Sequence, residues 1–264
     1  MKRQRRAAAA AVLIVATVLT TVTGCDSADH TLLEHTPRLR VEVVSTRPHD
    51  RGAFTEGLEV DDGTLYEDTG LPGRSTLTAT DLATGNRTAR IALPDEFFGE
   101  GITRSGDTLW QLTYREGVAF ARDPRTLAER RRVHYDGEGW GLCGRGDRLV
   151  MSNGGDALTF RDRETFAITG SVRLTSHHEV RLNELDCAAD GSVYANSWAT
   201  DHILRIDPDS GAVLADIDAS GLLSPAQRAG ADVLNGIAQL PGTDRFLITG
   251  KYWPTIFEVR FVPA

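Results

Sequence analysis

The sequence predicts an all-β fold, a five-bladed β-propeller whose last blade is completed by an N-terminal strand. A short motif recurs five times at intervals of 40–52 residues, and propeller blades repeat with this period. The same order of turns and strands follows each copy, but the last copy lacks its fourth strand. The composition, 41% hydrophobic and 25% charged, is that of a folded protein rather than a disordered or fibrous one.

The recurring motif predicts the first and innermost strand of each unit. Its copies are FTEGLEV, FGEGIT, EGWGLC, RLNELDC and VLNGIA, and their centres align at Glu56, Glu100, Trp140, Asn183 and Asn235. The longest interval, before the last centre, contains a helix-like segment around residues 220–232.

Three further strands are predicted in each unit. A turn and a second strand follow each centre, as in DDGTLYEDTG and SGDTLWQLTY. The third strand ends in a polar turn whose carboxylate can accept backbone N–H bonds, and Asp81, Asp123, Asp162 and Asp207 hold that place. A fourth strand follows in the first four units, and the fifth unit ends at FEVRFVPA after three strands. The missing strand is predicted in PRLRVEVVST near the N-terminus, where it would leave few sheet edges exposed.

Residues 1–24 have the pattern of a bacterial secretory signal, with a basic start, an apolar stretch and the sequence VTGC, which resembles a lipobox. We expect a lipid anchor on Cys25, a flexible tether over residues 25–37, and the propeller over residues 38–264. The protein is then expected outside the cytoplasmic membrane, anchored as a lipoprotein. The alternative is ordinary secretion, with Cys25 removed or left free.

Charge and cysteine content narrow the function further. The net charge is −8, and four of the basic residues lie in the predicted signal, so the remaining chain is more acidic still. Nucleic-acid binding is disfavoured because a surplus of Lys and Arg is absent.

Cys143 and Cys187 fall on innermost strands of neighbouring units, where they form either a disulfide or two buried thiols. The chain contains two lysines, Lys2 and Lys251, so the processed chain keeps one.

Ten register positions are expected to meet at one mouth of the central channel. Because the first two strands of a blade are antiparallel, the start of the first and the end of the second lie at the same end. The second strands end at Gly70, Tyr114, Gly154, Trp198 and Lys251, which face the five centres given above. Positions that serve packing alone should look alike between blades, and these differ, which indicates a site.

Each of these residues also has a structural interpretation. Trp140 and Trp198 can fill the channel, Asn183 and Asn235 can bond strand ends, and Lys251 can neutralise Glu56 and Glu100 in an ion pair. His177 and His178 lack a set of ligands at a recognised metal spacing, so we expect a solvated loop there and no metal or cofactor.

The motifs FTEGL, LYEDTGLPGRS, FGEGIT, GWGL, RLNELD, YANSW, VLNGIA and TGKYWPTIFEV resemble the glutamine cyclotransferase family, the plant and bacterial type of glutaminyl-peptide cyclotransferase. The resemblance covers residues 40–262, in the order and spacing of the family. It implies a five-bladed propeller, unrelated to the zinc-dependent animal enzymes. It also implies an enzyme that converts the N-terminal glutamine of peptides to pyroglutamate and releases ammonia.

The resemblance also assigns residues. It implies that Glu100 is the catalytic glutamate, that Asn183 and Lys251 belong to the catalytic set, and that Phe54, Phe98, Trp140 and Trp198 form aromatic walls. Two positions depart from the family: Glu56 replaces a common glutamine, and Tyr114 stands at a tryptophan position. A second carboxylate near Glu100 raises the pKa of one of the pair. It can therefore change the pH optimum or the amine substrate, or abolish activity.

The chemistry predicts a role for each of these residues. We expect Glu100 to carry the proton, Lys251 and Asn183 to stabilise the developing oxyanion, and Glu56 to anchor the α-ammonium. The substrate-binding set is Phe54, Glu56, Phe98, Tyr114, Trp140, Trp198 and Asn235. We expect a monomer whose partners are peptides or proteins with an N-terminal glutamine. Two alternatives remain: a propeller glycosidase that uses Glu56 and Glu100, and a non-catalytic surface propeller that binds such peptides.

Overall fold

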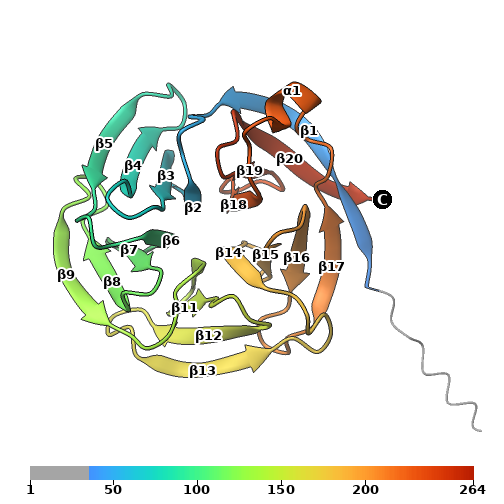
Figure 1. Cartoon of the computed structure of the whole chain (residues 1–264). Coiled ribbons are helices and arrows are strands. Elements are labelled where there is room, and N and C mark those ends of the chain that lie inside the picture. Colours follow the sequence, from blue (N-terminus) through green and yellow to red (C-terminus); the bar gives the residue numbers. More distant parts are fainter. Residues whose placement is uncertain (1–35) are drawn as a thin grey trace, which may run out of the picture. The chain divides into compact units, whose positions relative to one another are not determined.

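The computed structural model describes residues 36–264. The predictions for residues 1–24, for Cys25 and for most of the tether lie outside these residues. Within these residues, strands β1–β20 form three four-stranded sheets and one eight-stranded sheet, and one short helix lies outside the sheets. Figure 1 shows the sheets arranged side by side around a common centre, with one strand of each group innermost.

The strands follow the predicted order of first, second, third and fourth. The first and innermost strands are β2 (Thr55–Asp61), β6 (Gly99–Ser105), β10 (Leu142–Arg145), β14 (Leu182–Cys187) and β18 (Leu234–Gln239). The second are β3 (Thr64–Thr69), β7 (Thr108–Thr113), β11 (Arg148–Met151), β15 (Val193–Ser197) and β19 (Phe246–Gly250). The third are β4 (Thr76–Asp81), β8 (Val118–Arg122), β12 (Ala157–Asp162), β16 (His202–Ile206) and β20 (Thr255–Pro263). The fourth are β5 (Arg87–Ala92), β9 (Glu129–His134), β13 (Ile168–Arg173), β17 (Val213–Asp218) and β1 (Arg38–Pro48).

Strand β1 joins the beginning of the described chain to its end. It pairs antiparallel with β20 over most of its length, from Leu39 opposite Pro263 to Pro48 opposite Thr255. It also pairs in parallel with β17, which links two groups of four strands into the eight-stranded sheet. The N-terminal strand therefore lies beside the last three strands, as the sequence predicts.

The predicted aspartate turns are confirmed. Asp81 Oδ1 accepts from Thr84 N at 2.7 Å, and Asp162 Oδ1 accepts from Thr165 N at 2.7 Å. The corresponding turns after β8 and β16 are closed by Asp123 and Asp207 in the same way. These side chains satisfy backbone groups that the strands leave open.

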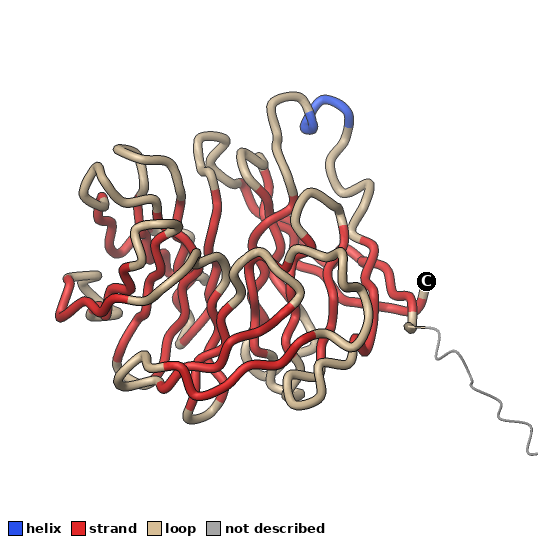
Figure 2. The backbone as a smooth tube through the Cα atoms, turned by 60° about the horizontal axis from the view of Figure 1, so that its bottom comes forward, coloured by secondary structure: helices blue, strands red, loops and turns tan. Residues whose placement is uncertain are grey.

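The predicted helix is short. It covers Pro225–Arg228 (α1) and is capped by Ser224, whose side chain accepts from Gln227 N. Figure 2 shows α1 on a loop that projects beyond the strand ends. This loop leads into β18, so it stands at the end of the ring where the innermost strands begin. Within residues 36–264, no helix is long and apolar enough to cross a membrane.

A disulfide joins two innermost strands. Cys143 of β10 and Cys187 of β14 are bonded with an Sγ–Sγ distance of 2.05 Å. Of the two alternatives that the sequence left open for these cysteines, the structure shows the disulfide.

Candidate active site

The predicted register positions gather at the end of the ring where the innermost strands begin. Four of the centres, Glu56, Glu100, Asn183 and Asn235, are each the second residue of their strand. Gly70, Tyr114, Trp198 and Lys251 each follow directly after a second strand. Trp140 and Gly154 lie outside β10 and β11, because these two strands are only four residues long. Backbone pairing nevertheless continues beyond the ends of β10 and β11 as far as Trp140, whose N donates to Ser152 O at 3.2 Å.

We call the predicted catalytic and substrate-binding residues the mouth cluster; they are Phe54, Glu56, Phe98, Glu100, Tyr114, Trp140, Asn183, Trp198, Asn235 and Lys251. Their aromatic rings form a continuous arc. Successive ring centroids are 6.2 Å apart for Phe54 and Phe98, 5.6 Å for Phe98 and Tyr114, 6.2 Å for Tyr114 and Trp140, and 6.1 Å for Trp140 and Trp198. All five predicted aromatic residues therefore share one surface.

Two glycines of the register make room for this arc. A Cβ on Gly70 would lie 2.3 Å from the Phe98 ring, and one on Gly154 would lie 2.6 Å from the indole of Trp140. Any side chain at these positions would displace the rings. Gly70 and Gly154 therefore contribute to the site because they lack side chains and leave space for the aromatic rings.

Glu56 and Lys251 form a buried ion pair within the cluster. Lys251 Nζ donates to Glu56 Oε1 at 2.7 Å, and the two side chains are 8% and 2% exposed. Asn235 Nδ2 donates to Thr55 O at 3.0 Å and lies 3.3 Å from Glu56 Oε2. The ammonium also lies 4.4 Å from the centre of the Phe54 ring. Both oxygens of Glu56 are therefore engaged by neighbouring side chains.

Glu100 is the carboxyl group of the cluster with a free oxygen. It is 4% exposed, and among the described residues its Oε2 has no hydrogen-bond partner. Burial, together with the nearby charge of Glu56, raises the pKa of Glu100 well above its usual range. Burial also raises the pKa of Glu56 to about 7, against the opposing effect of Lys251. Strongly perturbed carboxyl groups that share one cluster are typical of sites that transfer protons.

Two carboxamide oxygens of the mouth cluster also lack donors within residues 36–264. These are Oδ1 of Asn183 and Oδ1 of Asn235, and both side chains are buried. Buried acceptors without partners are unusual in folded proteins and are met at sites that bind a ligand. The mouth cluster therefore favours a ligand that brings N–H or O–H donors.

The sequence analysis missed Glu184, which follows Asn183. The residue after each of the other centres is a glycine: Gly57, Gly101, Gly141 or Gly236. A Cβ on Gly57 would lie 2.9 Å from Glu100 O, and one on Gly101 would lie 2.6 Å from Trp140 O. Neighbouring innermost strands are thus in backbone contact at this level, where the sequence predicted a channel. The exception to this glycine pattern was the signal that could have identified Glu184.

The carboxyl group of Glu184 closes the centre of the ring beneath the mouth cluster. Its Oε1 accepts from Leu58 N at 2.9 Å, which ties β14 to β2 across the ring. Its Oε2 has no hydrogen-bond partner among the described residues, and burial raises its pKa well above the usual range.

Two residues at the edge of the arc were also missed. Tyr252 extends the arc, with its ring centroid 5.2 Å from that of Phe54. The guanidinium of Arg181 lies 4.7 Å from the centre of the Trp140 ring and 4.2 Å from that of Trp198. Tyr252 lies one residue past a register position, so the repeats gave no signal for it. Arg181 begins its copy of the motif at the place that Phe54 and Phe98 hold in theirs, and this correspondence was the available signal. His177 and His178 are exposed, as predicted.

Comparison with known proteins gives consistent results. A family model described as glutamine cyclotransferase matches residues 12–261. The chain is 37% identical over 232 residues to the Arabidopsis thaliana glutaminyl-peptide cyclotransferase, a match that covers 85% of this chain and 72% of that protein. The crystal structure of Myxococcus xanthus glutaminyl cyclase superposes with a TM-score of 0.77 at 37% identity, over 87% of this chain and 100% of that one.

A more distant likeness concerns the fold alone. The Cps50 (Swd1) β-propeller domain of Myceliophteria thermophila matches with a TM-score of 0.51 at 10% identity, over 83% of this chain and 99% of that one. The sequence motifs, the strand order and the two relatives at 37% identity agree. The chain belongs to the glutamine cyclotransferase family.

Proposed function

We propose that this protein is a glutaminyl-peptide cyclotransferase, which converts the N-terminal glutamine of peptides and proteins to pyroglutamate and releases ammonia. The observation that carries the proposal is Glu100. Its carboxyl group is buried, has a free oxygen and a raised pKa, and belongs to the cluster that contains the Glu56–Lys251 pair and the aromatic arc. The two relatives at 37% identity, a glutaminyl-peptide cyclotransferase and a glutaminyl cyclase, support the same activity.

The reaction is an intramolecular acyl transfer. The neutral α-amine attacks the carbon of the side-chain carboxamide, a new C–N bond closes a five-membered lactam, and the bond to the amide nitrogen breaks. The attacking nitrogen loses one proton and the departing nitrogen gains one, so ammonia leaves and no net proton is consumed. A single carboxyl group that first accepts and then donates this proton meets the requirement.

Glu100 supplies that carboxyl group. Burial and the nearby charge of Glu56 raise its pKa well above the usual range of a glutamate. This stabilises the carboxylic acid form, which the second half of the reaction needs as proton donor. Its unpartnered Oε2 is free to accept the hydrogen of a bound amine.

Lys251 and Asn183 stabilise the negative charge that develops on the carboxamide oxygen. An ammonium has three donors, and Glu56 Oε1 engages one of those of Lys251, which leaves others for the substrate. Glu56 then orients Lys251, a role that differs from the predicted anchoring of the α-ammonium. The unpaired Oδ1 atoms of Asn183 and Asn235 are acceptors for the α-ammonium of the substrate.

The aromatic arc holds the glutamine side chain folded back on its own amine. Closing a five-membered ring requires the amine and the carboxamide carbon to approach, and such positioning contributes several kcal/mol, on the order of 7 kcal/mol in favourable cases. The rings, at successive centroid distances of 5.6–6.2 Å and inclined to one another by 53–89°, provide an apolar wall against the methylene groups.

For the fold, we propose five blades. The eight-stranded sheet contains two groups of four antiparallel strands, β14–β17 and β18–β20 with β1, joined by the parallel pairing of β1 with β17. Counting these groups separately gives five blades, each with one innermost strand from the recurring motif.

We also propose that the protein acts outside the cytoplasmic membrane as a monomeric lipoprotein. Residues 1–24 serve as the signal, Cys25 carries the lipid, and residues 25–37 form the tether of the domain over 38–264. A Cys25→Ala variant should appear in the medium rather than in the membrane fraction, and metabolic labelling with a fatty acid should mark the original chain alone.

Mass spectrometry of a peptide that begins with glutamine tests the activity. The proposal predicts a product lighter by one ammonia, together with ammonia in a coupled assay. Binding without this loss would favour the non-catalytic alternative. The glycosidase alternative needs Glu56 as a free carboxylate, and the bonds from Lys251 and Asn235 to Glu56 argue against it.

A further inference from the structure

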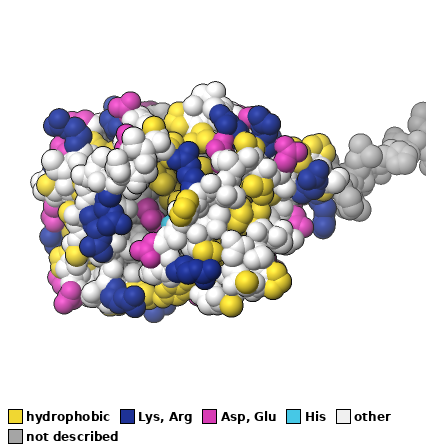
Figure 3. Space-filling model, turned by 90° about the horizontal axis from the view of Figure 1, so that it is seen from above, with side chains coloured by type: hydrophobic (Ala, Val, Ile, Leu, Met, Phe, Trp, Pro, Cys, Tyr) yellow, Lys and Arg dark blue, Asp and Glu magenta, His cyan; other side chains and the backbone are white. Residues whose placement is uncertain are grey.

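A polar groove lies between the sheet of β2–β5 and the pair of β1 and β20. Its volume is about 980 Å³, at the upper end of the range for ligand sites, about 300–1,000 Å³. Figure 3 shows one side of the molecule, where Lys and Arg side chains lie around a hollow that has acidic side chains inside. None of the mouth cluster residues lines this groove.

The groove exists because one of the spaces between sheets is incompletely filled. Four of the clusters that fill these spaces contain aromatic rings. The cluster between β2–β3 and β18–β20 contains none, and its members are Leu58, Val60, Leu65, Ala238, Leu247 and Ile256. The outer part of this space is therefore open.

Strand β4 accounts for the missing volume. Aligned on the aspartate turns, Thr78 and Thr80 occupy the places that Phe120 and Arg122 occupy on β8. Thr76, Thr78 and Thr80 all line the groove, since alternate residues of a strand face the same side. Short hydroxyl side chains here replace the large ones that fill the neighbouring space.

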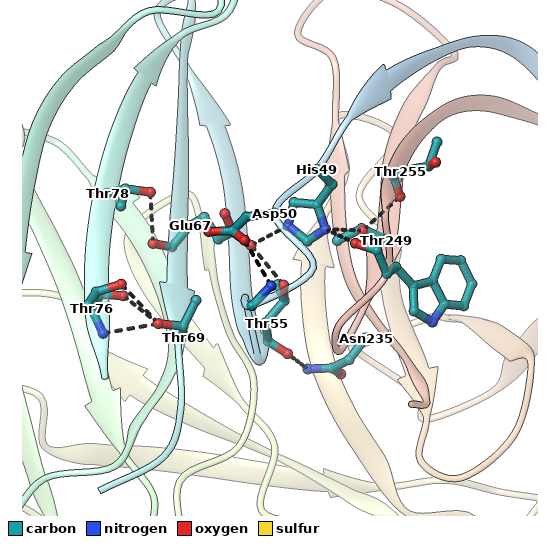
Figure 4. A network of polar contacts seen from close by, with 12 residues as sticks. His49, Asp50, Thr55, Glu67, Thr69, Thr76, Thr78, Asn235, Thr249 and Thr255 are labelled. Atoms are coloured by element: carbon teal, nitrogen blue, oxygen red, sulfur yellow. Dashed lines mark hydrogen bonds and ion pairs between the residues drawn. The ribbon is translucent and has the colours of Figure 1, made fainter. Parts of the chain in front are cut away.

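The acidic groups inside the groove are already engaged. Glu67 Oε1 accepts from Thr55 Oγ1 at 2.7 Å and lies 2.7 Å from His49 Nε2, and Figure 4 shows this network. Asp81 closes its own turn, and Asp50 Oδ1 accepts from Gly52 N at 2.8 Å. Each of these carboxylates thus uses one of its oxygens in contacts within the protein.

Of the four arginines that line the groove, Arg47 donates to Leu82 O, and the other three are free by comparison. Arg74, Arg87 and Arg90 line it and are exposed, and among residues 36–264 none of them forms an ion pair with an acidic side chain. In a protein with a net charge of −8, this is a local surplus of positive charge. Its chemistry fits carboxylate groups.

The groove begins next to the mouth cluster. Ala53 and Thr69 line the groove, and the residues that follow them, Phe54 and Gly70, belong to or contact the mouth cluster. Ala53 O also accepts from Tyr252 N at 2.7 Å, so Tyr252 and Phe54 separate the two regions. A chain that starts at the mouth cluster and passes over these rings enters the groove.

We propose that this groove binds acidic side chains of the polypeptide whose N-terminal glutamine is cyclised at the mouth cluster. The proposal rests on the proposed function and adds that the enzyme prefers substrates with acidic residues downstream of the N-terminal glutamine. Arg87 and Arg90 select carboxylates several residues downstream of the glutamine, at a place that does not take part in the chemistry.

The test compares substrates and variants. Two peptides share the start Gln-Ala-Ala and continue with five glutamates or five glutamines, and a Gln-Ala dipeptide amide reports on the mouth cluster alone. We expect the Arg87→Ser/Arg90→Ser variant to raise KM for the glutamate peptide about threefold to tenfold, with kcat unchanged and the dipeptide unaffected. The matched control, Arg40→Ser/Arg125→Ser, removes two exposed arginines that do not line the groove and should change none of these values.

A binding measurement separates this proposal from the activity. A labelled peptide with alanine in place of the first glutamine, followed by the glutamate segment, is titrated by fluorescence anisotropy. The original protein should bind it more tightly than the glutamine version, and the groove variant should lose this preference. Equal binding by the groove variant and the control variant overturns the proposal. Absence of ammonia release from every glutamine peptide overturns the proposed function instead.

Discussion

Buried and half-buried carboxyl groups with raised pKa values occur at two levels of the innermost strands. At the mouth end, Glu56 and Glu100 share their surroundings with a lysine, two asparagines and an arc of aromatic rings. Farther along the same strands, Glu59 and Asp186 are accompanied by Thr103, which donates to Glu59 at 2.8 Å. Perturbed acidity alone therefore does not mark a catalytic site, because burial in the centre of the ring produces it at both levels.

The difference lies in the groups around each acid. Glu100 has an oxygen without a partner among the described residues and a cation in the same cluster that can stabilise developing charge. The Glu59 level offers no lysine and no aromatic arc within residues 36–264. We therefore expect substitutions at the mouth end to reduce activity and substitutions at the level of Glu59 to change stability.

The largest expected effect is the loss of turnover in Glu100→Gln. Glutamine keeps the shape but cannot accept a proton, so kcat should fall by about 10²–10⁴-fold. Ammonia release from a glutamine peptide measures this loss, and an unchanged melting temperature shows that the fold is intact. Turnover close to that of the original protein would remove Glu100 from the mechanism.

Lys251→Arg should have the next largest effect. The guanidinium keeps the positive charge that Glu56 requires, but its planar fork fits a site for a point charge poorly. We expect kcat/KM to fall by about 10–100-fold, with less change in stability than in Lys251→Met, which leaves Glu56 buried without its partner. Undiminished kcat/KM in Lys251→Arg would assign this lysine to structure alone.

Glu56→Gln should shift the pH dependence rather than abolish activity. The charge of Glu56 contributes to the raised pKa of Glu100, after burial. Removing it lowers that pKa, so the carboxylate of Glu100 persists to lower pH. The acidic limb of the kcat/KM profile should move to lower pH by about one unit. No shift would show that the two groups do not interact, and a shift to higher pH would contradict the sign of the interaction.

The smallest effect on activity is expected for Glu59→Gln, which should change stability. Burial and the charge of Asp186 raise the pKa of Glu59 from 4.5 to about 8. The folded state thus holds the proton more tightly than the unfolded state, so the stability of the original protein falls as the pH rises from 4.5 to 8. The variant cannot ionise and should exceed the original by about 2 kcal/mol at pH 9 and match it at pH 5. Denaturant unfolding at both pH values measures this difference.

The sequence revealed those features of the site that follow the repeats. Glu100, Asn183 and Lys251 hold register positions in different units, and antiparallel pairing within each unit brings them to the same end. The aspartate turns and the N-terminal strand were predictable for the same reason, since each depends on local pattern.

The missed features depend on closure of the ring. The hydrogen bond from Leu58 N to Glu184 joins different units, and its distance is set by how closely the innermost strands pack. An ion pair of Lys251 was one alternative that the sequence offered, and the structure shows it with Glu56. The groove beside β4 depends on the volumes of side chains in two sheets at once. The one available signal was Glu184, a large residue in a register that otherwise contains glycine.

A direct test of the central claim compares Glu100→Gln and Glu59→Gln on the same peptide with an N-terminal glutamine, with ammonia release measured at pH 7. The account predicts that Glu100→Gln loses nearly all turnover and that Glu59→Gln stays within about twofold of the original protein. Equal losses in the two variants, or loss in Glu59→Gln alone, would contradict the assignment of the chemistry to the mouth cluster.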